Sequence, residues 1–217
     1  SRPVFEALYV DMLAGLEAHF TVQPYLFGGL PSIADHVLMG PLFGHLARDP
    51  VPATIMKQRA PRVFRWTEHM NTPEIVSPEL ADAPAEYLAD DEIPVTLLAL
   101  LRQCLTDVGE TITTTASHYN EWVADQGDLP SASVIEDGVD EPLLGSFEAT
   151  IRGVPISQTV NVHMLWVLQR ALDWFATLNP ADQDTCHALL NELGGPDLFS
   201  IELERRLTRV DNCMALD

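Results

Sequence analysis

The chain has 217 residues, of which 47% are hydrophobic and 20% charged, a globular composition that excludes disorder throughout. Lysine and arginine total 12 against 32 aspartates and glutamates, and the formal net charge of −20 repels nucleic-acid phosphates and anionic membranes. No apolar run approaches the roughly 20 residues that span a bilayer, so we expect no membrane helix.

The cysteines and the first residues of the chain favour the cytoplasm as its compartment. Cys104, Cys186 and Cys213 are odd in number and far apart, so they make neither a disulfide framework nor a zinc-binding pattern. The chain opens on an amphipathic segment without a signal-type apolar stretch. We therefore expect reduced thiols in a cytoplasmic protein, and no metal site.

The first predicted element is a helix over residues 3–20, where apolar residues recur at spacings of three and four. It stops before Pro24. A turn with Gly28-Gly29 follows, since glycine supplies backbone conformations that other residues avoid.

A second helix is predicted to start after Ser32. Ser32 has the position of a helix N-cap, and Asp35 lies where its carboxylate can reach back to the N-cap amide, so the two residues predict a capping box. Gly40-Pro41 falls inside this helix. Proline removes a backbone hydrogen bond there, and we expect a kink or a break.

Later segments extend the helical pattern. Helices are expected over 61–70, from Pro94 towards Trp122, over 165–175, over 180–194 and over 203–214, whereas residues 71–92 read as an exposed connection. Between them, alternating residues near 147–160 with a turn at Arg152-Gly153 predict one β-hairpin.

The segment from Tyr25-Leu26-Phe27-Gly28-Gly29 to Ser32-Ile33-Ala34-Asp35 resembles the C-terminal helical domain of cytosolic glutathione transferases. That family places such a turn before a capping box that opens a buried central helix. The pattern of Pro61, Trp66, Met70 and Pro73 resembles its next helix. The resemblance implies a mainly α fold: a transferase-like helical core over 1–73, and a helical extension with one small hairpin over 74–217.

The resemblance also implies a division of labour. In the family, a thioredoxin-like domain binds glutathione and activates its thiol, while the helical domain forms a wall of the pocket for a small electrophile. No thioredoxin-like pattern is found in this sequence, so that domain is an expected partner, glutathione would be a co-substrate of the longer protein, and the chain alone is expected to be inactive. Ser32 and Asp35 carry over as folding residues, and no catalytic residue is assigned. A homodimer is a further candidate assembly.

Two alternatives stay open. The chain could be a non-catalytic interaction module with a transferase-like helical fold, or a helical binding protein unrelated to that family. The natural reading frame discriminates between the enzyme and the interaction module, because an upstream thioredoxin-like segment favours the enzyme.

One constellation is a candidate substrate-binding site. His163, Trp166 and Arg170 are spaced by three and four, which places an imidazole, an indole and a guanidinium along one helix face. A cation beside an aromatic surface suits a small anionic or conjugated ligand. The simpler interpretation is that Trp166 packs in the core while Arg170 pairs with an acid.

Overall fold

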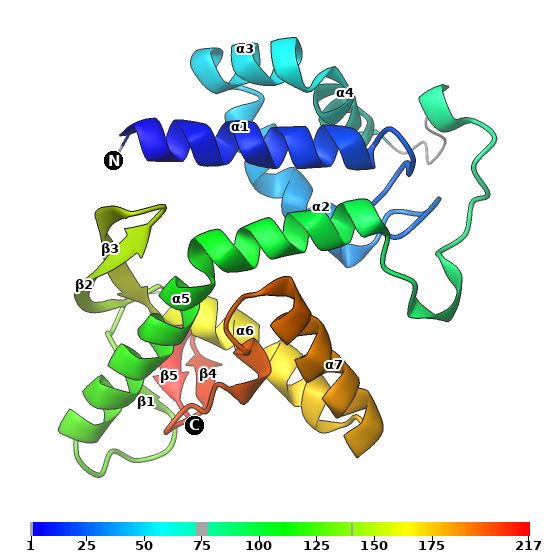
Figure 1. Cartoon of the computed structure of the whole chain (residues 1–217). Helices are drawn as coiled ribbons and strands as arrows, with labels where there is room; N and C mark the ends of the chain where they lie inside the picture. The colour runs from blue at the N-terminus through cyan, green and yellow to red at the C-terminus, as the bar shows by residue number, and fades with distance from the viewer. Residues whose placement is uncertain (1, 73–77, 140) are drawn as a thin grey trace. The chain divides into compact units, whose positions relative to one another are not determined.

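The computed structural model describes residues 2–72, 78–139 and 141–217, which divide into two compact units (Figure 1). The N-terminal unit comprises Arg2–Gln103 and the C-terminal unit comprises Cys104–Asp217. Helix α5 (Val95–Asp125) belongs to both, since the division falls within it. The domain boundary predicted between residues 73 and 74 lies outside the described residues.

The N-terminal unit is helical. It contains α1 (Arg2–His19), α2 (Ile33–Pro41), α3 (Pro50–Arg59), α4 (Pro61–His69) and the start of α5, with short 3-10 turns at Pro78–Leu80 and Ala89–Asp91. Its core is made of large apolar side chains from α1, α3, α4, α5 and the segments between helices, among them Leu13, Leu16, Phe20, Leu42, Met56, Val63, Trp66, Leu97 and Leu100.

The second helix changes character at the predicted break. After Pro41 the chain forms a π-helical turn over Leu42–Leu46, closed by a 2.7 Å hydrogen bond from the Ala47 N–H to the Leu42 carbonyl. Proline has no N–H to continue the α-helical pattern, and a widened turn is one way to accommodate it. Helix α3 has no counterpart among the predicted helices. It starts at Pro50, because proline is well tolerated in a first helical turn.

The C-terminal unit mixes helices with two small sheets. Strands β2 (Leu143–Ile151) and β3 (Val154–Asn161) form an antiparallel hairpin, followed by α6 (Val162–Ala176) and α7 (Pro180–Leu193). Strands β1 (Ser133–Val134), β4 (Leu207–Val210) and β5 (Cys213–Leu216) form an antiparallel sheet of order β1-β5-β4. Its core joins α5, α6 and this sheet through Tyr119, Val162, Leu165, Leu207, Met214 and Leu216.

The helix predicted over 203–214 is wrong. Leu207 and Met214 instead belong to β4 and β5, which pair in antiparallel register. The chain reverses at Asp211 and Asn212, whose φ angles are 47° and 68°. Aspartate and asparagine tolerate this left-handed region, and two consecutive positive φ values are the geometry of a tight hairpin turn.

The predicted fold class is therefore wrong as well. The described chain is 57% helical and 14% strand, with seven helices and two small sheets of three and two strands, so its fold is mixed α/β and not a mainly α bundle with one hairpin. No helix in the described ranges is both long and apolar enough to cross a membrane.

Candidate functional site

The start of α2 is held by a buried carboxylate. Asp35 is 0% exposed, and its oxygens accept hydrogen bonds from the Leu26 N–H at 2.9 Å and from the Ser32 N–H at 2.8 Å. The Ser32 hydroxyl donates to the same carboxylate at 2.6 Å and accepts from the Asp35 N–H, which completes a capping box. Asp35 thus joins the turn that precedes the helix to the helix itself.

The turn before α2 depends on a close backbone approach. Gly29 donates its N–H to the Glu86 carbonyl at 2.9 Å, and a Cβ at position 29 would lie 1.7 Å from the carbonyl oxygen of Pro84. No side chain fits in that space, so the chain requires glycine there.

Helix α2 is enclosed on one side only. Leu42, in the π-helical turn, is 1% exposed, whereas Ile33 is 80% and Val37 68% exposed. The resemblance implied a central, buried helix, and within the described residues α2 instead presents Ile33, His36 and Val37 to solvent.

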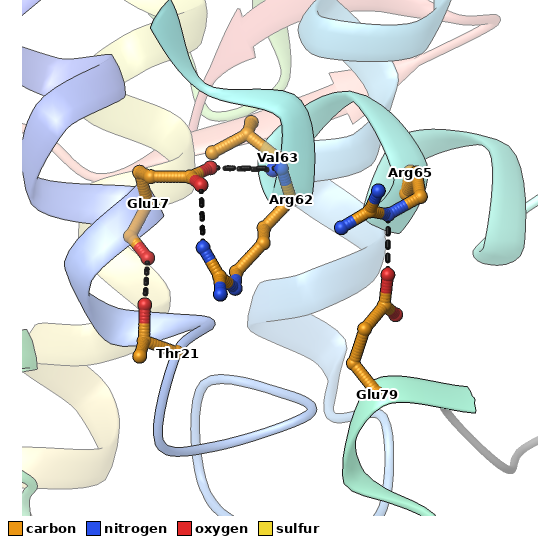
Figure 2. Close-up of polar contacts among 6 residues, drawn as sticks. All are labelled: Glu17, Thr21, Arg62, Val63, Arg65 and Glu79. Carbon is orange, nitrogen blue, oxygen red and sulfur yellow. Dashed lines mark hydrogen bonds and ion pairs between the residues drawn. The ribbon is translucent and has the colours of Figure 1, made fainter.

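Helix α4 is capped from a distance. Its N-cap residue, Ala60, provides no side-chain hydrogen bond. Instead, the Glu17 carboxylate on α1 accepts from the N–H groups of Arg62 at 2.9 Å and Val63 at 3.2 Å, and also from the Arg62 guanidinium at 3.1 Å (Figure 2). A carboxylate at this position satisfies two free helix N–H groups and complements the helix dipole.

A cavity of about 300 Å³ lies beside this contact, within the N-terminal unit. Its lining combines aromatic, cationic and anionic side chains: Phe20, Pro24, Arg62, Arg65, Trp66, Glu68, His69 and Glu79. The Phe20 and Trp66 rings are stacked, with centroids 4.8 Å apart. Figure 2 shows the Arg65 guanidinium paired with the carboxylate of Glu79.

His69, in the cavity lining, contacts the buried Tyr25 side chain. His69 contacts the Tyr25 hydroxyl through Nε2 at 3.0 Å. Burial raises the pKa of Tyr25, and the nearby Asp35 carboxylate raises it further. The phenol therefore keeps its proton at neutral pH, which makes it unsuited to act as a general base.

The residues predicted for substrate binding lie together on α6, in the C-terminal unit. The His163 and Trp166 rings have centroids 5.6 Å apart, and the Arg170 guanidinium carbon lies 4.5 Å from the Trp166 centroid. Arg209 on β4 adds a second guanidinium at 5.0 Å, a contribution that spacing along α6 could not reveal. Trp166 packs against the core of its unit.

Helix α6 is fixed to the sheet by a buried amide. The Gln169 side chain donates to the Leu207 carbonyl at 3.0 Å and accepts from the Leu207 N–H at 2.9 Å. The N-cap of the helix is Asn161, whose side chain accepts from the His163 and Met164 N–H groups. Both anchors hold the aromatic and cationic face of α6 in a defined orientation.

Side-chain clusters that bind metal ions are absent from the described residues. Among residues 2–72, 78–139 and 141–217, no three histidine, cysteine or acidic side chains gather as a metal-binding group. The three cysteines are free thiols.

No protein-family model, curated protein or solved structure matches the chain. The likeness to glutathione transferases thus depends only on the residues of the turn, the capping box and α4.

Proposed function

We propose that this chain is the helical half of a glutathione-transferase-like protein, with the transferase-like core in its N-terminal unit. In that protein a thioredoxin-like domain would bind glutathione as co-substrate and activate its thiol, and the helical half would contribute a wall of the pocket for a small electrophile. Among the described residues the strands pair only in antiparallel fashion, without the parallel βαβ unit of such a domain.

The observation that carries the proposal is the network around Asp35. A capping box alone is common at helix starts, because any helix has free N–H groups to satisfy. Here the same carboxylate also accepts from the Leu26 N–H in the preceding turn. The turn, the box and the helix form one hydrogen-bonded unit, in the order on which the resemblance is based.

The exposed outer face of α2 departs from the buried central helix that the resemblance implies, and the proposal must account for it. Ile33 and Val37 lie on this face next to the Asp35 network. Fully burying an aliphatic side chain of this size contributes about 1.5–3 kcal/mol, and covering these two partly exposed side chains would contribute part of that for each. We assign the face as the surface that the thioredoxin-like domain covers, which would make α2 the enclosed helix that the family resemblance implies.

The experiment compares this chain with the protein that its gene encodes. We expect the gene-encoded protein to be retained on immobilised glutathione and eluted by free glutathione. The chain of 217 residues, as the matched control, should flow through because the glutathione-binding domain is not among its parts. Conjugation of glutathione to a chromogenic chloronitrobenzene, followed by absorbance, then reports whether the bound thiol is activated.

Failure of the gene-encoded protein to bind glutathione contradicts the proposal. The exposed face of α2 would then favour the alternative, an interaction module that uses the same helix to dock another protein. Binding without conjugation would identify a non-catalytic member of the same structural class.

A further inference from the structure

The cavity between the end of α1 and α4 has no part in the proposed function. Its apolar side is formed by the stacked rings of Phe20 and Trp66 together with Pro24. Its volume of about 300 Å³ is at the lower end of the range for small-molecule sites. A planar ring is the kind of group that such aromatic walls favour.

The two arginines of the cavity are already neutralised. The Arg62 guanidinium is bound to the Glu17 carboxylate, and the Arg65 guanidinium is bound to Glu79 (Figure 2). An anionic ligand would have to compete with both carboxylates. These arginines therefore give little net attraction for negative charge.

Glu68 adds a negative charge to the cavity lining. Glu68 lines the cavity and is exposed, and its carboxylate has no ion-pair or hydrogen-bond partner in the part of the chain that the structure describes. The chain as a whole carries a formal charge of −20, a field that concentrates cations at its surface. Both effects favour a positively charged ligand.

Trp66 adds a second feature. The side chain is 5% exposed, and its indole Nε1 has no hydrogen-bond partner among the described residues. Because Trp66 lines the cavity, its indole resonance reports a ligand that binds there.

We propose that this cavity binds a small arylalkyl amine, an aromatic ring joined to an aliphatic amino group, in its protonated form. The ring lies against the side formed by Phe20, Pro24 and Trp66, and the ammonium group pairs with the Glu68 carboxylate. The site lies wholly within the N-terminal unit, and its occupation does not depend on glutathione.

The test uses the intact 217-residue chain labelled with ¹⁵N, and follows its four tryptophan indole resonances. A Trp66→Phe variant, or backbone assignment if that variant does not fold, identifies the Trp66 resonance. Titration with 2-phenylethylammonium should move this resonance saturably. The probes 3-phenylpropionate, which has the same ring and opposite charge, and ethylammonium, which has no ring, should bind at least about tenfold more weakly.

Variants then assign the charge. Glu68→Gln should weaken 2-phenylethylammonium binding by about three- to tenfold, the size expected for a solvent-accessible ion pair. Glu6→Gln is the matched control, because it changes the net charge equally at an exposed position on α1 that does not line the cavity. No saturable shift at Trp66, equal binding of 3-phenylpropionate, or equal weakening by the two variants would overturn the proposal.

Discussion

Helices α2 and α4 satisfy their first N–H groups with residues from different parts of the sequence. At α2 the partners are Ser32 and Asp35, three residues apart. At α4 the acceptor is Glu17, which lies 45 residues before Arg62 and 46 before Val63. The cap of α2 therefore comes from a local sequence pattern. The cap of α4 forms only when α1 and α4 pack together.

The comparison separates local from tertiary determinants of the same structural feature. A local cap stabilises its helix before the rest of the unit folds. A remote cap links the stability of α4 to the position of α1. Substitutions at the two sites measure these contributions independently, because they share no hydrogen-bond partner.

The largest effect is expected for Asp35→Ala. The substitution removes an acceptor of three hydrogen bonds and leaves the Leu26 N–H without its partner. We expect unfolding free energy to fall by about 3–5 kcal/mol, measured by urea denaturation monitored by circular dichroism. A loss below about 1 kcal/mol would show that the network around α2 contributes little to stability.

A smaller loss is expected for Glu17→Ala. The change leaves two N–H groups of α4 uncapped, and we expect a loss of about 2 kcal/mol in the same measurement. Glu6→Gln on the same helix breaks only the exposed pair with Arg2 and should cost less than about 0.5 kcal/mol. Equal losses for the two variants would contradict a capping role for Glu17.

Ser32→Ala should be milder still. The hydroxyl accepts one N–H at 3.4 Å, and the Asp35 carboxylate keeps its other donors. We expect a loss of about 1 kcal/mol, the usual cost of losing an N-cap side chain. A loss as large as that of Asp35→Ala would mean that serine, and not the buried carboxylate, organises the start of α2.

A small loss of stability is expected at Arg170, which stacks on Trp166 at an exposed position. Arg170→Ala should cost about 0.5 kcal/mol of stability. If the predicted ligand site on α6 exists, the variant should also lose melting shifts that a panel of small anionic and conjugated molecules produces in the parent chain. If the ligand-induced melting shifts of the variant and the parent chain are equal across the panel, Arg170 does not contribute to ligand binding at that site.

The same distinction explains what the sequence could predict. The box of Ser32 and Asp35 and the hairpin turn at Arg152-Gly153 are local signals, and the structure contains a capping box and a reversal at those residues. The turn at Asp211-Asn212 is also local, but it was overlooked because Leu203, Leu207, Val210 and Met214 have helical spacing. Apolar spacing over a short segment cannot by itself separate a helix from two paired strands.

Other features have no local signal. Nothing near Arg62 indicates that Glu17 caps α4, and nothing on α6 indicates that Arg209 reaches Trp166. Similarly, the amide contacts of Gln169 with Leu207 join residues 38 apart. Such contacts follow from tertiary packing, which spacing along one helix does not encode.

The proposed covering of α2 is tested most directly by a matched pair of variants. Val37 on α2 is 68% exposed and Val51 on α3 is 61% exposed. In this chain, Val37→Asp and Val51→Asp should change the melting temperature equally and little. In the gene-encoded protein, we predict that Val37→Asp lowers the melting temperature by more than about 4 °C relative to Val51→Asp, because the charge would be buried beneath the thioredoxin-like domain. Equal melting of the two variants there would show that the outer face of α2 remains in solvent, and would contradict the proposal.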